Sequence, residues 1–147
     1  MNEEYNLDQA FLAEKENRLH EWVLSFLRSS GNNLKLANKL EKYGQNNVRL
    51  LSYPVEKVIN IIGADESFKY QEDVSILNDR VSKMVDSIKK GWRPPPIIVT
   101  DIWEDEIEIA DGGHRQRAII DLGITEYPMI FYFRSKDRMD EFLRTKI

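Results

Sequence analysis

Cysteine is absent from the 147 residues of this sequence. This absence excludes disulfide bonds, a thiolate metal site and any reaction that needs a thiol. Apolar residues never run on for the roughly 20 positions that a helix needs to cross a bilayer. The N-terminal stretch MNEEYNLDQ is acidic and lacks the apolar segment of a signal peptide. We therefore expect a cytoplasmic protein that makes no contact with a membrane.

An excess of positive charge is also missing, because the formal net charge is −4. Binding to DNA without sequence preference needs a basic surface that releases counterions. We therefore do not expect the chain to bind DNA on its own, although a small basic pocket is compatible with this charge. The length is sufficient for one folded unit with a hydrophobic core.

Hydrophobic spacing predicts an α+β or mixed α/β domain with a small sheet. Spacing of three and four residues predicts helices, whereas alternation and short apolar runs predict strands. The expected helices are 7–28, 33–43, 54–63, 72–90, 114–122 and 135–147. The expected strands are 48–53, 97–103, 107–111 and 126–133, with a turn near 104–106 and an exposed polar loop over 64–73.

The first two expected helices form an αα-hairpin, because SSGNN at residues 29–33 stops one helix and can cap the next. We therefore divide the chain into an N-terminal helical extension at 1–46, packed on the core, and an α+β domain at 47–147. The exposed faces of the helical hairpin are a candidate surface for a protein partner.

The stretch Asp111-Gly112-Gly113-His114-Arg115 lies where an expected strand ends and a helix begins. The first four N–H groups of a helix have no partner within the helix, and glycine lets a ligand approach the backbone closely. Such N–H groups and a basic side chain together form an anion site, most often for phosphate. We interpret Gly112 and Gly113 as the backbone cradle and Arg115 as a bidentate clamp.

Helix geometry distinguishes the basic side chains of this turn. Arg115 precedes Ala118 by three residues and Ile119 by four, so it lies on the buried stripe, where a guanidinium needs a partner. Arg117 points elsewhere and is expected in solvent. His114 lies at the turn itself and can donate to a phosphate or act as an acid or base near neutral pH.

A purely structural interpretation explains the same residues. Asp111 can cap the helix and pair with Arg115 at a spacing of four residues, and the two glycines can form only a tight turn. Residue chemistry alone leaves both interpretations open.

The order of motifs over a longer stretch, PPPIIVTD…IEIADGGHRQRAIIDLGITEYPMIFYF, resembles the core of the ParB/sulfiredoxin-like superfamily. In that superfamily a proline-led strand, a hairpin, a glycine-containing turn with His-Arg or Arg-Arg, a short helix, an LG pair and a further strand follow in this order. RLLSYPVEKV and DRVSKMVDSIKKG are similar to its opening strand and helix. The resemblance covers about residues 48–133.

The resemblance implies a nucleotide or phosphate pocket at the turn. Members include ParB CTPases that act as DNA clamps, sulfiredoxins that use ATP, ADP-dependent free serine kinases and proteins described as ParB-like nucleases. By this resemblance Gly112, Gly113, His114 and Arg115 bind the phosphates of a nucleoside di- or triphosphate, with or without Mg²⁺. It also makes His114 and Asp111 the candidate catalytic residues. We expect no separate metal site.

The sequence departs from each of these members. Without a cysteine, sulfiredoxin chemistry is excluded, and no helix-turn-helix follows the core, so we do not expect a full partition protein. A kinase needs a carboxylate near the phosphate, for which Asp65, Glu66 and Glu72 are candidates that no pattern separates.

Three functions follow from these observations. The first is nucleotide binding, with phosphate hydrolysis or transfer left open. The second is a regulatory or DNA-associated adaptor without catalysis. The third is a nuclease, which ranks last because the sequence shows no clustered carboxylates at two-metal spacing. The nucleotide and the acceptor are not determined by the sequence.

Overall fold

The computed structural model describes residues 5–65, 67–103 and 106–145. Its helices are α1 (Leu7–Lys15), α2 (Leu19–Arg28), α3 (Leu34–Leu40), α4 (Val74–Lys89), α5 (Gly113–Asp121) and α6 (Lys136–Thr145), with 3₁₀ turns η1 (Gln45–Asn47) and η2 (Val55–Lys57). Its strands are β1 (Val48–Pro54), β2 (Ile62–Gly63), β3 (Tyr70–Gln71), β4 (Ile97–Trp103), β5 (Glu106–Asp111) and β6 (Glu126–Tyr132).

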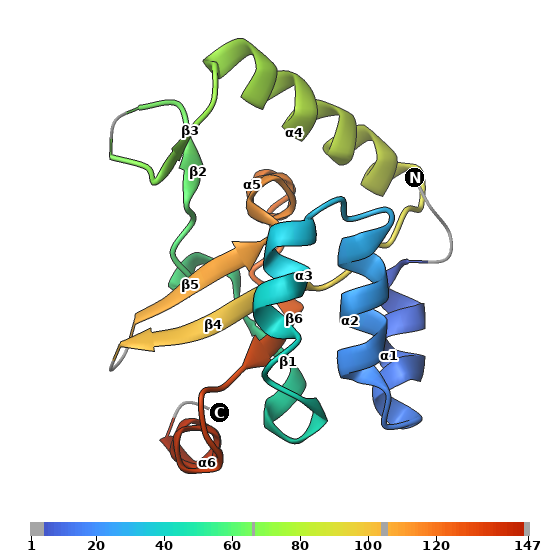
Figure 1. Ribbon diagram of the computed structural model, residues 1–147. Helices are drawn as coiled ribbons and strands as arrows, with labels where there is room; N and C mark the ends of the chain where they lie inside the picture. Colours follow the sequence, from blue (N-terminus) through green and yellow to red (C-terminus); the bar gives the residue numbers. More distant parts are fainter. Residues whose placement is uncertain (1–4, 66, 104–105, 146–147) are drawn as a thin grey trace.

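Four strands form one mixed sheet in the order β1-β6-β4-β5 (Figure 1). β4 and β5 pair as an antiparallel hairpin, β4 runs parallel to β6, and β1 is antiparallel to β6. The short strands β2 and β3 pair with each other in parallel. The predicted α+β class and the predicted hairpin are therefore confirmed, whereas residues 104 and 105 of the expected turn lie outside the described part.

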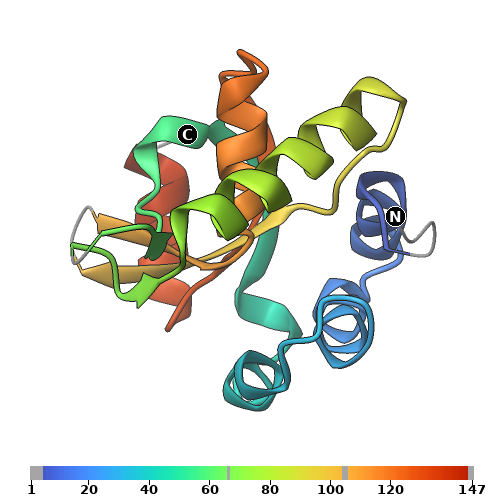
Figure 2. The same cartoon turned by 90° about the horizontal axis from the view of Figure 1, so that it is seen from above.

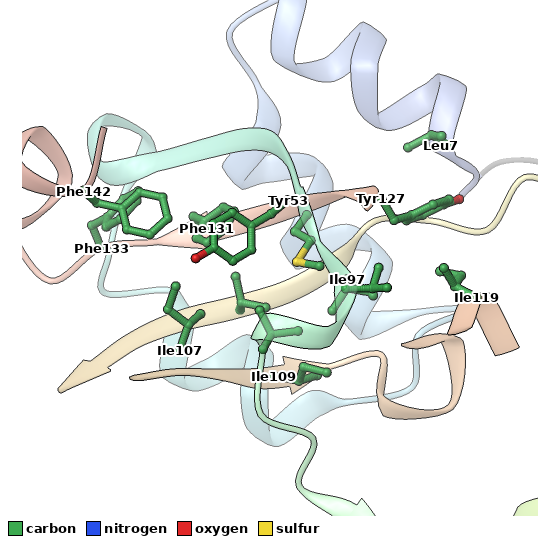
Figure 3. Close-up of a cluster of buried hydrophobic side chains, with 14 of the residues drawn as sticks. Leu7, Tyr53, Ile97, Ile107, Ile109, Ile119, Tyr127, Phe131, Phe133 and Phe142 are labelled. Atoms are coloured by element: carbon green, nitrogen blue, oxygen red, sulfur yellow. The ribbon is translucent and has the colours of Figure 1, made fainter. Parts of the chain in front are cut away.

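Both faces of the sheet are covered, because alternate residues of each strand belong to different hydrophobic clusters. On one face, Ile98 and Ile130 pack with the buried side chains of α2 and α3. On the other face, Ile97 and Phe131 pack with α5 and α6 through side chains such as Phe142 (Figure 3). The N-terminal helices thus cover much of one side of the sheet.

The N-terminal segment has three helices where the sequence predicted a hairpin of two. The expected helix over 7–28 is broken, because Asn17 has a φ of 57° and the amide of Arg18 bonds to the carbonyl of Ala13 at 2.9 Å. A left-handed residue ends a helix, and asparagine tolerates this conformation better than most residues. The break lets α1 and α2 bury different stripes. Whether 1–46 forms a separate extension stays a prediction.

The helix expected after Pro54 is wrong beyond its first turn, η2. The backbone of Ile59 instead bonds to β5, with its amide 2.8 Å from the carbonyl of Ile107 and its carbonyl 2.9 Å from the amide of Ile109. The chain then continues into β2, at the end of the expected helix. β2 pairs with β3, which lies in the segment expected to be a loop. Pairing with a distant strand replaces local helical bonds here.

Helix α4 lies outside the sheet and crosses α5 (Figure 2). Leu77 and Val81 of α4 are buried against Ala118 of α5. Because Ile119 of α5 packs with the sheet residues, α5 lies between the sheet and α4. No helix in the described part of the chain is long and apolar enough to span a membrane.

Candidate functional site

The turn between β5 and α5 depends on Gly112. This residue is the N-cap of α5 and has a φ of 114°, which side-chain-bearing residues rarely adopt. Because glycine has no side chain, Gly112 occupies the N-cap position without a side-chain hydrogen bond to the helix. The N–H groups of the first turn of α5 therefore keep the potential to bind an acceptor.

Arg115 is buried on the core side of α5 as predicted, with 8% of its surface exposed. Its Nη2 donates to the carbonyl of Pro96 at 3.0 Å and to Oδ2 of Asp111 at 3.3 Å. Its Cζ lies 5.7 Å from the centre of the Phe26 ring, a cation–π distance. The buried Nε has no hydrogen-bond partner among the described residues.

Asp111 was expected, in the purely structural interpretation, to pair with Arg115 and to cap the helix, and it does only the first. It pairs with Arg115, as that interpretation expects. It does not cap α5, because its Oδ1 accepts a hydrogen bond of 3.1 Å from Nδ2 of Asn33, at the start of α3. The carboxylate is therefore fixed from two sides, by Arg115 of α5 and by Asn33 of the N-terminal segment.

Each glycine of the pair has a neighbouring side chain close to the position of its missing Cβ. A Cβ at Gly112 would lie 2.8 Å from Nη2 of Arg115, and a Cβ at Gly113 would lie 2.6 Å from Oδ1 of Asn60. The side chains of Arg115 and Asn60 thus occupy the space that the glycines leave. This packing explains the Gly-Gly pair without a ligand, and it leaves the predicted cradle role untested.

His114 is held by Glu72, which lies in the polar segment before α4. Its Nε2 is 2.9 Å from Oε1 of Glu72, and Oε2 of Glu72 is 3.2 Å from Arg80. An ionised carboxylate only accepts hydrogen bonds, so Nε2 carries the proton and Nδ1 remains for a ligand or for proton transfer. Of the three candidate carboxylates, the structure brings Glu72 to the turn. Asp65 instead bonds to Ser67, and Glu66 lies outside the described residues.

Arg117 is not in solvent, contrary to prediction. Its Nη2 donates to the carbonyl of Ile62 at 2.6 Å, and its guanidinium lies 5.2 Å from the Phe68 ring. The prediction failed because β2 lies against this side of α5, an arrangement that the helical pattern does not contain. Arg117 therefore joins α5 to β2.

The sequence analysis missed a pair of amides that fixes α5. Gln116 is buried and donates to the carbonyls of Val55 at 2.7 Å and Val58 at 3.0 Å. Its Oε1 accepts from Asn60, which also donates to the carbonyl of Gly113 at 3.0 Å. A polar residue within the apolar run VINII was the only sequence signal for Asn60.

The run of prolines before β4 is fixed by two bonds next to the turn. Tyr127 donates its hydroxyl to the carbonyl of Pro94 at 2.6 Å, close to the Arg115 bond to Pro96. Burial raises the pKa of Tyr127 far above its usual value of 10, so the hydroxyl keeps its proton and remains a donor.

A cavity of about 1040 Å³ opens beside the turn, and all five predicted residues, Asp111 to Arg115, line it. Its other walls come from the α2–α3 connection, α3 and the β2–β3 segment. Thr100, Glu108 and Ala110 also line it, which locates the cavity on the sheet face that carries the N-terminal helices. The structure thus gathers the predicted residues on one wall, while their role in binding stays a prediction.

Among the residues that the structure describes, no three His, Asp or Glu side chains are grouped to hold a metal ion. The absence of a metal site in the chain stays a prediction.

Comparisons with known proteins identify a family for most of the chain. Residues 54–140 match the ParB N-terminal domain. Among solved structures, the chain is similar to the C-terminally truncated chromosome-partitioning protein ParB from Caulobacter crescentus complexed with CTP-gamma-S, at 18% sequence identity and a TM-score of 0.39. That match covers 67% of this chain and 54% of the other, so this chain spans about half the length of that protein. No curated protein matches the sequence.

Proposed function

Because the chain belongs to the ParB N-terminal domain family, we propose that it binds the phosphates of a nucleoside di- or triphosphate at the turn from Asp111 to Arg115. Family membership supports a nucleotide pocket at this turn, and the geometry supports phosphate as the bound group. The sulfiredoxin-like fold and the role of each site residue belong to the same proposal.

The observation that carries the proposal is the arrangement at the start of α5. The N-terminus of α5, which has no side-chain cap, lines one cavity together with His114 and the buried Arg115. Amides at a helix N-terminus attract anions, and a neighbouring cation strengthens that attraction. Arg115 uses Nη2 for its hydrogen bonds to Pro96 and Asp111, so in this proposal Nη1 donates to the phosphate.

The same arrangement defines what each residue does if phosphate is transferred or hydrolysed. His114, with its proton on Nε2 directed at Glu72, presents Nδ1 as the acid or base. Asp111 orients Arg115 from its carboxylate at 3.3 Å and is therefore a positioning residue for the clamp. If Mg²⁺ accompanies the nucleotide, it neutralises charge on the phosphate oxygens.

The first experiment is a thermal-shift panel with ATP, ADP, CTP, GTP and pyrophosphate, each with and without Mg²⁺. CTP belongs in the panel because the similar ParB structure contains its analogue. A ligand at about 100 times its Kd stabilises a protein by roughly 2.7 kcal/mol, which gives a clear rise in Tm. We expect a rise with at least one nucleotide, and a flat panel would refute the proposal.

The matched variants are Arg115→Lys and Arg49→Lys. Lysine keeps the charge at 115 but lacks the planar fork that binds phosphate oxygens in pairs, so the ligand-induced shift should fall strongly. Arg49 is exposed on β1 and lies outside the cavity lining, so its replacement should leave the shift unchanged. Equal shifts in the two variants would exclude Arg115 from the site.

A second candidate function is an adaptor without catalysis. It is favoured by α1, where the neighbouring side chains of Phe11 and Leu12 are 44% and 42% exposed. Exposed apolar neighbours are typical of surfaces that bind another protein. This function predicts a partner bound at α1 and no nucleotide turnover, so the panel and a turnover assay distinguish the two. That the chain does not bind DNA alone stays a prediction.

A further inference from the structure

The connection between α2 and α3 lies against the turn from Asp111 to Arg115. It precedes the family-matched segment, which begins at residue 54. Two side chains from this region touch the turn. Asn33 bonds to Asp111 at 3.1 Å, and the ring of Phe26 lies 5.7 Å from the guanidinium carbon of Arg115. Part of the cavity wall therefore lies outside the part of the chain that defines the family.

Asn33 uses both ends of its amide. Its Oδ1 accepts from the amide of Leu36 and caps α3, while its Nδ2 donates to Oδ1 of Asp111. The other carboxylate oxygen of Asp111, Oδ2, accepts a hydrogen bond from Arg115. Asn33 consequently fixes the carboxylate of Asp111, which orients the buried guanidinium of Arg115. A substitution of Asn33 should therefore alter the position of the guanidinium through Asp111.

Two lysines of α3 bring positive charge to this cavity that no carboxylate of the described residues neutralises. Lys35 and Lys39 are four residues apart, exposed and among the lining residues. The two carboxylates of the lining already have partners, Glu108 with Lys69 at 3.7 Å and Asp111 with Arg115. Neither Lys35 nor Lys39 forms an ion pair with another residue in the described part of the chain. An anion in the cavity would supply the missing negative charge.

We propose that α3 and the loop before it form the second wall of the phosphate site. Lys35 and Lys39 bind the outer phosphates of a polyphosphate whose inner phosphate lies at the start of α5, and Asn33 is the positioning residue for the Asp111–Arg115 pair. This inference rests on the proposed function and specifies its ligand class, a chain of two or more phosphates. Orthophosphate fills only the α5 end of such a site.

The test is isothermal titration calorimetry with orthophosphate, pyrophosphate and tripolyphosphate, which separates the phosphate chain from the nucleobase. For the wild type we expect affinity to rise with each added phosphate. Lys35→Ala/Lys39→Ala should weaken tripolyphosphate by about tenfold, because two charge-assisted contacts are lost, and should leave orthophosphate unchanged. It should also reduce the salt dependence of tripolyphosphate binding.

The matched control is Lys15→Ala/Lys57→Ala, which removes the same charge from two exposed lysines that do not line the cavity. It should bind all three anions as the wild type does. If both double variants lose the same affinity, net charge explains the effect and the second wall is refuted.

Asn33→Ser separates the two tasks of Asn33. Serine caps helices about as well as asparagine but is too short to reach Asp111, so Tm should change little while pyrophosphate binds several-fold more weakly. Asn33→Asp also keeps the cap but brings a second carboxylate to Asp111, and it should weaken binding further. A lower Tm with unchanged affinity in both variants would make Asn33 merely structural.

Failure of this inference is distinguishable from failure of the proposed function. A wild type that binds no phosphate compound refutes both. A wild type whose binding depends on Arg115 but not on Lys35, Lys39 or Asn33 refutes only the second wall.

Discussion

At the scale of single residues, the conformation of the turn depends on the missing Cβ of Gly112, because the side chain of Arg115 lies close to its position. The guanidinium of Arg115 comes within 2.8 Å of the position that a Cβ of Gly112 would take, and it is held there by Pro96 and Asp111. The side chain of Arg115 cannot move aside without losing both bonds. The conformation of one backbone residue and the position of the cation are therefore coupled.

Gly112→Ala should lower the free energy of unfolding by about 2–3 kcal/mol, since a left-handed conformation costs an alanine roughly 1–2 kcal/mol and the new methyl group displaces Arg115. Gly123→Ala is the matched control, because Gly123 has a φ of 76° but no atom within 4 Å of its added Cβ. It should show only the backbone cost. Chemical denaturation measures both, and equal losses would contradict the coupling.

At the scale of secondary-structure elements, His20 adds a hydrogen bond to the apolar packing of α2 on the sheet. The Nδ1 of His20 lies 2.8 Å from the hydroxyl of Tyr132 on β6, and the amide of His20 donates to Gln45. Burial lowers the pKa of His20 below its ordinary 6.5, although a hydrogen bond with the backbone of Glu41 acts in the opposite direction. The neutral imidazole is therefore favoured in the folded state.

The stability of the protein should depend on pH through His20. The unfolded chain binds this proton more readily, so the folded state loses stability as pH falls below about 6.5, until the lower folded pKa is passed. Above that range the contribution is constant. In His20→Asn, whose amide can take the place of Nδ1, Tm should fall less steeply on the acid side. Parallel Tm profiles for wild type and variant would contradict this assignment.

At the scale of the whole molecule, the N-terminal helices and the sheet share one hydrophobic cluster. The family-matched segment begins at Pro54 and therefore leaves out nearly all of β1 as well as these helices. Without α1, α2 and α3, apolar residues of three strands would be exposed on one face, among them Ile98, Ile130 and Tyr132. The described fold is thus larger than the segment that defines the family.

A chain that begins at residue 45 should not unfold cooperatively, and it should bind the dye ANS, because the removed helices leave one sheet face bare. Differential scanning calorimetry and ANS fluorescence measure the two properties against the full chain. A sharp transition without dye binding would instead support the predicted division into an extension at 1–46 and an independent domain at 47–147.

The sequence by itself determined the local features of this protein. A short apolar run placed β4 and alternating apolar residues placed β5. Three- and four-residue spacing placed α4, and the spacing from Arg115 to Ile119 put Arg115 on the buried stripe. These patterns are local because strand and helix periods repeat over a few neighbouring residues. They also located the turn from Asp111 to Arg115 and the pairing of these two residues, although not the distant partners of its side chains.

Only the tertiary structure decided those partners. Asn33 and Asp111 are 78 residues apart, Asn60 and Gln116 are 56 apart, and Glu72 and His114 are 42 apart. The end of α1 at Asn17 and the extended course of the chain at Ile59 depend likewise on what packs or bonds there. A hydrogen bond between distant residues leaves no period in the sequence, because its donor and acceptor meet only after the sheet and helices have packed.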